Sequence, residues 1–567
     1  MLVRKLISLA ATLSFVIVAG CAAQLSDSRS PAPAPGKAAV ASADPLATQA
    51  GLDVMAAGGN AFDAAVAVAA TLGVVEPSSS GFGGGGFFLL YIAATDEYRF
   101  IDAREMAPIL STRDMYLDED GNPVKGLTVS GPLAAGIPGE PAGMAYLAEN
   151  FGTLPFADLL APAIRHAEEG FTMSRRALLG LRFRKRSVAE SPAMAEVFLP
   201  NGELPAIGDV IRQPDLATTL RRMAADGADG FYKGETAHLL VDGVQAAGGI
   251  WTLDDLSNYR VIEREPQITN YRGMKVVSAP LPSSGGIVLT QVFNFLDGYA
   301  PEQLAGVQGK HLLIEGMRRA YRDRALYMGD TDYVAVPVAR LTSRAHMDAQ
   351  RASVALDRAT PSSELDGIPD DGSAGDQTTH FSVIDAAGNR VAATITINTW
   401  YGAAFIPPGT GVILNNEMDD FSIKPGVPNE FELVGDEANA VAPGKRPLSS
   451  MSPTFLESDR GIAVVGTPGG SRIITMVLNA SLDWFNGATA EDMVSRKRFH
   501  HQYLPDRVSY EPGAFSADEI AALEAMGHTL KEVARPYGNM NVVTYDFATG
   551  EVRSATDPRG EGEGRVY

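Results

Sequence analysis

Residues 376–385 read Asp376-Gln377-Thr378-Thr379-His380-Phe381-Ser382-Val383-Ile384-Asp385, and the composition of the chain changes sharply at this stretch. The preceding segment, residues 357–377, is rich in Pro, Gly, Ser and acidic side chains. Such a segment buries too little apolar surface to offset its ordering entropy, so we expect a mobile tail. The apolar residues after Thr379 and the run Val391–Ile397 predict two strands joined by a turn near Gly388-Asn389.

A mobile segment that leads directly into a buried strand is a place where a chain can be cut without losing its core. A cut before Thr378 would give that residue both a hydroxyl nucleophile and an α-amine, which titrates at about pH 7.7–8.0. We therefore treat Thr378 as a candidate catalytic residue. The residues alone leave open a simpler interpretation, in which Thr378 and Thr379 only begin a strand as β-forming residues.

The first 21 residues have the pattern of an export signal. Two basic residues precede the apolar stretch Leu6–Ala19, which is too short for a comfortable membrane span. The stretch leads into Val18-Ala19-Gly20-Cys21, which is similar to a bacterial lipobox, where the cysteine is acylated. Because Cys21 is the only cysteine, the chain can form no internal disulfide.

We accordingly expect a lipoprotein signal peptide over residues 1–21 and a flexible tether, rich in Ala, Ser and Pro, over residues 22–43. Ala22 after the cysteine indicates, by analogy with lipoproteins, delivery to the outer membrane of a Gram-negative bacterium, facing the periplasm. The alternative is a plain secretory signal that happens to contain a cysteine.

The chain of 567 residues is 45% hydrophobic and carries a formal net charge of -21. This length suits several domains or one large layered core. The acidic balance argues against nucleic acid as a partner, because such partners require a basic surface.

Hydrophobic periodicity predicts most of the helices, and the Ala- and Val-rich helix over 61–75, with Asn60 as its N-cap, is expected to be buried on all sides. The helix over 310–327 is basic on one side, which we interpret as a solvated face. The full set of expected helices is 46–57, 61–75, 141–150, 155–169, 215–226, 234–247, 252–259, 287–296, 310–327, 473–486 and 517–526.

Gly81, Gly83 and Gly86 match the spacing of a dinucleotide-binding loop, but that loop must follow a strand and open a helix. Here a predicted helix precedes the glycines and a strand, 87–92, follows them. We therefore reject a dinucleotide site, expect no cofactor, and expect the glycines to allow close approach of backbone. The eight histidines are scattered apart from His500-His501, a pair for which we expect a structural role and no metal.

Several segments in order along the chain resemble the motifs of the γ-glutamyltransferase family, from about Ala43 to the C-terminus. They are 58–65, the glycine run 81–86, 102–108, 282–286, the stretch 377–383, 415–421, 446–454, 468–473 and 498–502. The resemblance implies an α/β fold, the four-layer αββα sandwich of the N-terminal nucleophile hydrolases. It also implies a precursor that cleaves itself between Gln377 and Thr378 into a large subunit, 44–377, and a small subunit, 378–567, which stay together as a heterodimer.

The resemblance also assigns roles to individual residues. Thr378 is implied as the nucleophile, Thr396 as a group that steadies it, and the backbone amides of Gly469 and Gly470 as the oxyanion hole. Substrate-binding roles are implied for an arginine that takes the α-carboxylate, two serines that assist it, and three groups around the α-ammonium: Arg104, Ser449, Ser450, Asn398, Glu417 and Asp420. On composition alone, the two acids would be a solvated loop and the serines and glycines ordinary turns.

Residues 424–436 resemble a lid loop that some family members carry over the site. Phe431 occupies the position that we align with the gating tyrosine of that lid. A phenylalanine can form a wall of the pocket, but it has no hydroxyl to bind Asn398.

We expect a γ-glutamyltransferase and glutathione hydrolase that acts on small molecules, namely glutathione, other γ-glutamyl compounds and amino acid or dipeptide acceptors. Two alternatives within the family are a glutaryl-type β-lactam acylase and a poly-γ-glutamate processing enzyme. A third, from another class, is an inactive binding lipoprotein of the same fold. Membrane contact is expected through the lipid anchor only.

Overall fold

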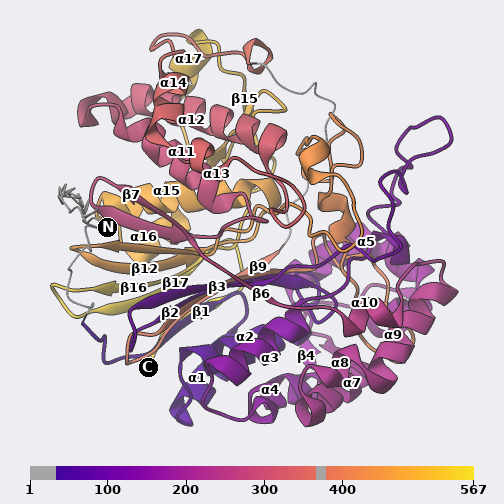
Figure 1. The fold of residues 1–567 in the computed structure, drawn as a ribbon. Coiled ribbons are helices and arrows are strands. Elements are labelled where there is room, and N and C mark those ends of the chain that lie inside the picture. The colour runs from indigo at the N-terminus through magenta and orange to yellow at the C-terminus, as the bar shows by residue number, and fades with distance from the viewer. Residues whose placement is uncertain (1–32, 366–377) are drawn as a thin grey trace, which may run out of the picture. The chain divides into compact units, whose positions relative to one another are not determined.

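Two antiparallel β-sheets lie face to face in the computed structural model, which describes residues 33–365 and 378–567 (Figure 1). The first sheet has the order β18-β1-β9-β10-β2-β3-β6 and the second the order β17-β16-β12-β11-β8-β7. The strands of the first sheet are β1 (Ala39–Ser42), β2 (Gly85–Ile92), β3 (Glu97–Ala103), β6 (Ile262–Arg264), β9 (Thr379–Ile384), β10 (Arg390–Thr396) and β18 (Glu563–Val566). Those of the second are β7 (Gln267–Tyr271), β8 (Met274–Ser278), β11 (Thr454–Ser458), β12 (Gly461–Gly466), β16 (Asn541–Asp546) and β17 (Val552–Thr556).

Helices cover the outer face of each sheet, so the order of layers is helix, sheet, sheet, helix (Figure 1). On the first sheet lie α1 (Pro45–Ala56), α2 (Ala61–Val75) and α3 (Glu140–Asn150), while α4 (Phe156–Glu169) packs on α2 and α7 (Pro214–Asp226) packs on α4. On the second lie α11 (Gly285–Asp297), α15 (Ile473–Phe485) and α16 (Ala490–Ser495), while α12 (Gly306–Tyr327) and α14 (Arg344–Arg351) pack on α11. The expected αββα fold is confirmed.

The remaining elements lie at the ends and edges of these layers. The helices are α5 (Arg175–Glu190), α6 (Pro192–Phe198), α8 (Asp229–Tyr232), α9 (Gly234–Ala246), α10 (Leu253–Ser257), α13 (Val338–Leu341) and α17 (Ala517–Ala525). The strands are β4 (Phe171–Thr172), β5 (Val210–Ile211), β13 (Phe499–His500), β14 (Val508–Tyr510) and β15 (Leu530–Glu532). None of the helices in the described ranges is long and apolar enough to cross a membrane.

The first sheet is buried on both faces, and this explains the continuous apolar run of β2. Phe87 and Leu89 point toward the second sheet and pack in the core between the sheets. Phe88 and Leu90 point the other way and pack against the helices of the first layer. The two-residue period of a strand therefore divides one apolar run between two cores.

The structure confirms the predicted helix over 61–75, including its N-cap and its complete burial. Asn60 caps it, since its side chain accepts hydrogen bonds from the backbone amides of Phe62 and Asp63, and every residue of the helix is buried. The predicted turn between β9 and β10 is also present, with Gly388 at a φ of 97°.

Two segments expected to be flexible are ordered where the structure describes them. Ala39–Ser42, assigned to the tether, is the buried strand β1 between β9 and β18. Its small side chains fit a crowded place in the sheet, although their composition is also typical of a linker. The tail predicted over 357–377 is held as far as residue 365, because the backbone amide of Ala359 donates to Met526 (2.6 Å) and that of Ser362 donates to Asp506 (2.6 Å). Residues 366–377 lie outside the described ranges.

The prediction of a solvated basic face on α12 is wrong. Arg318, Arg319 and Arg324 are buried. Arg319 lies 2.5 Å from Glu315, one helical turn away, and Arg318 pairs with Asp506. These partners neutralise charges that burial would otherwise make costly.

Replacing Arg319 by Met should lower the free energy of unfolding by about 3 kcal/mol, the low end of the range for a broken buried ion pair, because Glu315 would lose the nearer of its two arginine partners and keep only Arg318. The shift in the thermal unfolding midpoint measures this. Arg186→Met is the matched control, since the Arg186 side chain is 92% exposed. Equal shifts for the two variants would contradict the structural role given to Arg319.

Candidate active site

The antiparallel pairing of β9 with β10 brings two threonine hydroxyls together. The register pairs Thr379 with Ile395, so that Thr378 lies opposite Thr396 at the end of the pair. Their Oγ1 atoms are 3.1 Å apart, and both residues are buried. Thr378 has a φ of 130°, a conformation that β-branched residues rarely adopt and that costs conformational energy.

The glycine run lets the backbone before β2 pass directly beside this pair. A Cβ on Gly84 would lie 2.0 Å from the carbonyl oxygen of Thr396, and one on Gly86 would lie 2.6 Å from that of Thr394. No side chain fits at either distance. The expected close approach is confirmed, and it fixes the strand that carries Thr396.

Arg104 follows β3 and is the charged centre of the site. Its guanidinium donates to the carboxylates of Glu417 and Asp420, the second at 2.5 Å, and all three residues lie in one cavity with Thr378. The predicted roles assign the arginine and the acids to opposite charges of a ligand. In the structure they are paired with each other, because buried charges are stable only when compensated. A ligand with both an ammonium and a carboxylate would exchange these pairs for its own.

The neighbours of these charged residues hold them in place. Asp102 accepts from the backbone amide of Arg104 (2.9 Å) and pairs with Arg446 (2.5 Å). The side-chain oxygen of Asn415 accepts from the backbone amide of Glu417 (2.9 Å), while its amide nitrogen donates to the carbonyl oxygens of Gly83 and Gly136 (2.7 Å each). The segments around 102–108 and 415–421 therefore position the arginine and the glutamate.

Two serines line the same cavity. Ser449 and Ser450 are held by the turn before α11, where the Ser283 hydroxyl donates to the carbonyl oxygen of Met451 (2.6 Å) and the Ser284 hydroxyl donates to that of Ser449 (2.8 Å). Behind them, Arg324 of α12 donates to the Ser450 hydroxyl (3.3 Å). Burial lowers the pKa of Arg324 to about 10, so it remains a cation at neutral pH.

Two consecutive glycines lie just before α15, and the second of them lines the cavity with Thr378. Gly469 and Gly470 have φ values of 140° and 54°, which favour glycine, and both are buried. Neither backbone N–H donates a hydrogen bond to any described group. Phe431 lies against them, since a Cβ on Gly470 would be 2.3 Å from its ring. Buried donors without an acceptor, next to a hydroxyl, are suited to receive a developing oxyanion.

One cavity thus gathers nearly all the predicted site residues. Those that line it are Arg104, Thr378, Thr396, Asn398, Glu417, Asp420, Phe431, Ser449, Ser450 and Gly470. Gly469 precedes the last of these and does not line the cavity, while Gln377 and Cys21 lie outside the described residues.

Sequence reasoning missed Leu433, Met451 and Ile473, which complete the wall of the cavity, and Arg324 behind it. The three apolar residues carry no signal that separates them from any core residue. Arg324 lies on α12, for which the sequence predicts a solvated basic face.

The site combines two cations with buried carboxyls. Arg104 and Arg324 are the cations, and Glu417 and Asp420 are paired with Arg104. Burial raises the pKa of both carboxyls, and the Arg104 guanidinium opposes this shift. A third acid, Glu105, is fully buried and its carboxylate oxygens accept no hydrogen bond from any described group. Burial raises its pKa to about 7, although Arg104 opposes the shift. A guanidinium and two carboxyls that line one cavity suit a zwitterionic ligand better than a simple anion.

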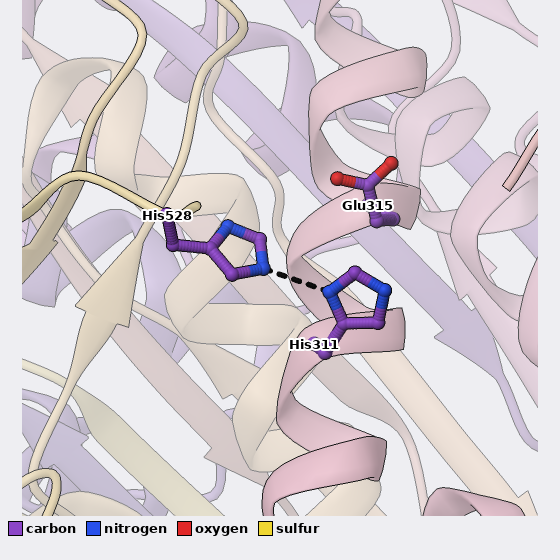
Figure 2. Close-up of side chains that lie close together, drawn as sticks. All are labelled: His311, Glu315 and His528. Atoms are coloured by element: carbon purple, nitrogen blue, oxygen red, sulfur yellow. Dashed lines mark hydrogen bonds between the residues drawn. The ribbon is translucent and has the colours of Figure 1, made fainter. Parts of the chain in front are cut away.

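Three side chains elsewhere have the composition of a metal site: His311, Glu315 and His528, whose candidate ligand atoms lie within 4.8 Å of one another (Figure 2). The two histidines are hydrogen-bonded to each other at 2.8 Å, and the other nitrogen of His311 lies 2.9 Å from the carbonyl oxygen of Ala355. The Glu315 carboxylate forms ion pairs with Arg318 and Arg319 of α12. These contacts join α12 to the segments around 355 and 528, and we assign the cluster a structural role.

Both histidines of the His500-His501 pair are buried and hydrogen-bonded to protein side chains, which agrees with the expected structural role. His500 contacts Thr475 (2.8 Å) and Gln502 (2.7 Å), and His501 contacts Asp506 (3.2 Å).

The family model and the most similar curated proteins point to the same family. The family model described as Gamma-glutamyltranspeptidase matches residues 47–567. The glutathione hydrolase proenzyme of Pseudomonas sp. (strain A14) is 44% identical over 86% of this chain and 85% of its own, and that of Escherichia coli (strain K12) is 41% identical over 92% and 90%. Among solved structures, cephalosporin acylase from Bacillus halodurans is similar with a TM-score of 0.82 and 28% identity, over 95% of this chain and 97% of that one.

Glu105→Gln should change how stability depends on pH. The raised pKa means that the folded chain holds a proton which the unfolded chain releases near the ordinary value of 4.5. The stabilisation from this proton is complete below pH 4.5 and is lost as the pH rises to about 7. The variant has no such loss, so its thermal midpoint should rise relative to the parent between pH 5 and pH 8.

The control is Glu119→Gln, on an exposed loop, whose difference from the parent should stay constant across this range. A constant difference for Glu105→Gln as well would show that Glu105 is not held protonated.

Proposed function

The chain belongs to the γ-glutamyltranspeptidase family, and we propose that it is a glutathione hydrolase and γ-glutamyltransferase that activates itself by cutting its chain before Thr378. The observation that supports this most strongly is the cavity in which the Thr378 hydroxyl lies with Arg104, Glu417 and Asp420. The relatives named as proenzymes of glutathione hydrolase agree with both the activity and the precursor.

Self-cleavage begins with attack of the Thr378 hydroxyl oxygen on the carbonyl carbon of Gln377. The C–N bond breaks, the peptide becomes an ester on Thr378, and the nitrogen takes the hydroxyl proton. Water then hydrolyses the ester, which leaves a carboxylate on Gln377 and a free α-amine on Thr378. The unfavourable φ of Thr378 supports cleavage here, because the cut relieves that constraint.

The mature Thr378 then acts on the γ-amide of the donor. Its hydroxyl oxygen attacks the γ-carbonyl carbon, while its own α-amine accepts the proton. The amides of Gly469 and Gly470 donate to the oxyanion, and Thr396 holds the hydroxyl by the 3.1 Å contact. The C–N bond breaks, the amine product leaves with the proton, and a γ-glutamyl ester remains. Water, or the amine of an amino acid or dipeptide, resolves this ester.

The charges of the cavity support a free amino-acid head on the donor. The α-carboxylate would bind Arg104 with Ser449 and Ser450, and the α-ammonium would bind Glu417, Asp420 and Asn398. Arginine suits the first role because its planar group binds two oxygens at once.

We further propose that Cys21 is acylated and anchors the enzyme in the outer membrane, facing the periplasm. The sequence Val18-Ala19-Gly20-Cys21 supports this. The intact mass of the mature large subunit tests it: the absence of a lipid on a subunit that begins at Cys21 would refute it.

Thr378→Ala should leave a single uncut polypeptide and lower hydrolysis of a γ-glutamyl anilide by about 10³-fold or more, because both reactions use the same oxygen. Gel mobility and anilide turnover measure the two effects. Thr379→Val is the matched control, since its side chain points to the opposite face of β9, and it should still be cut. Cleavage of Thr378→Ala at this junction would refute the autocatalytic account.

The parent enzyme should turn over a γ-glutamyl anilide with a kcat/KM at least about tenfold above that of the glutaryl anilide, which lacks the ammonium. This comparison separates the proposal from a glutaryl-type acylase, the activity named for the similar solved structure. A preference for the glutaryl compound would overturn our choice of substrate.

A further inference from the structure

A second cavity, which we name the edge cavity, lies beside β7 at the edge of the second sheet. It opens where β7, α11 and α15 end and where α12 begins, and Tyr271, Leu296, Phe485 and Gly306 line it from these ends. Its volume is about 450 Å³, which falls within the range of small-molecule sites. It shares no lining residue with the cavity that contains Thr378, so it is a separate candidate site.

Most of the wall of the edge cavity is apolar. Leu296, Leu313 and Phe499 are buried residues of the core that covers the second sheet. Leu482 is partly buried, and Phe485 is exposed to 38% although it packs against the same wall. Covering such apolar surface removes it from water and is favourable. The wall therefore suits a ligand with an apolar body.

Three cationic side chains from different parts of the chain also line the edge cavity. They are Arg272 after β7, Lys310 in α12 and Arg496 after α16, and all three are partly buried. Within residues 33–365 and 378–567, no acidic side chain lines this cavity. Cations at an apolar wall without acids select a ligand that joins an apolar body to an anionic group.

Two of these cations retain donors for such a group. The Lys310 ammonium lies 2.7 Å from Glu519, and the Arg496 guanidinium pairs with Asp483 through one terminal nitrogen. Because a lysine has three N–H donors and an arginine has five, both can also donate to an anion in the cavity.

The third cation is fixed in place and shares its acid with another arginine. The Arg272 guanidinium donates to the carbonyl oxygen of Tyr299 (2.5 Å) and pairs with Asp297 (3.3 Å). Asp297 also pairs with Arg344 (2.5 Å), so one carboxylate compensates two guanidinium groups. A second carboxylate, supplied by a ligand, would complete this compensation.

We propose that the edge cavity binds an amphipathic monoanion, namely a carboxylate on an apolar chain. The chain lies against Leu313, Leu482 and Phe485, and the carboxylate accepts hydrogen bonds from Lys310 and Arg496. A free fatty acid is the occupant, because it has these two features and no other polar group. The site is independent of the proposed function, since it uses none of the catalytic residues.

Titration calorimetry of the purified protein with laurate, below its micelle concentration, tests this proposal. The parent should bind laurate saturably, and octanoate should bind at least about tenfold more weakly because it buries four fewer methylene groups. Lys310→Gln and Arg496→Gln should each raise the Kd of laurate about fivefold or more. The exposed Arg186→Gln is the matched control and should bind as the parent does.

A cavity-filling variant keeps the test valid if the charge variants fold poorly. Leu482→Trp should abolish laurate binding while its thermal midpoint without laurate stays close to that of the parent. Laurate should raise the thermal midpoint of the parent, because a ligand of the native state stabilises it. A lowered midpoint would show that laurate only denatures the protein, and this would overturn the proposal.

Dodecyltrimethylammonium, a cation with a chain of similar length, separates a charged site from exposed apolar surface. It should bind at least about tenfold more weakly than laurate. Equal affinity for the two compounds would overturn the proposal, as would the absence of saturable laurate binding. An unchanged Kd in both charge variants and in Leu482→Trp would place the laurate elsewhere and overturn it too.

Discussion

The pairing of β9 with β10 is the constraint on which the rest of the site depends. It places Thr378 opposite Thr396 at the inner face of a sheet that is buried on both sides. A shift of one residue in this register would turn Thr378 toward the helices, away from every other group of the cavity. The apolar residues Phe381 and Val383, which must face the helix layer, prevent such a shift.

The charged half of the site depends on segments that are far apart in the sequence. Arg104 comes from the end of β3, the two acids from the segment after residue 415, and Arg324 from α12. Arg104 is paired with the two acids and Arg324 donates to the Ser450 hydroxyl, so both cations are retained inside a core. The pairing of Arg104 with the acids also means that ligand binding is an exchange of ion pairs, in which the protein gives up contacts of similar strength. Binding of this kind favours specificity over raw affinity.

Local sequence patterns predicted the elements that are strongly periodic or well capped, such as α2 with Asn60 and the hairpin at Gly388. They failed where composition and environment disagree. Ala39–Ser42 has the composition of a linker but lies in a sheet. Arg318 and Arg319 of α12 are buried because Glu315 and Asp506, the second of them distant in sequence, neutralise them. The site residues were predicted through motif resemblance, since Ser449 or Asp420 alone look like turn residues. The apolar wall at Leu433, Met451 and Ile473, and the pairing of Arg104 with the acids, follow only from the three-dimensional arrangement.

The central claim is that one side chain serves as nucleophile only after the chain has been cut before it. N-terminal sequencing of the smaller fragment of the purified, active protein tests this most directly. The account predicts a fragment that begins Thr378-Thr379-His380-Phe381. Active protein that is intact across Gln377 and Thr378, or a fragment that begins at another residue, would contradict it.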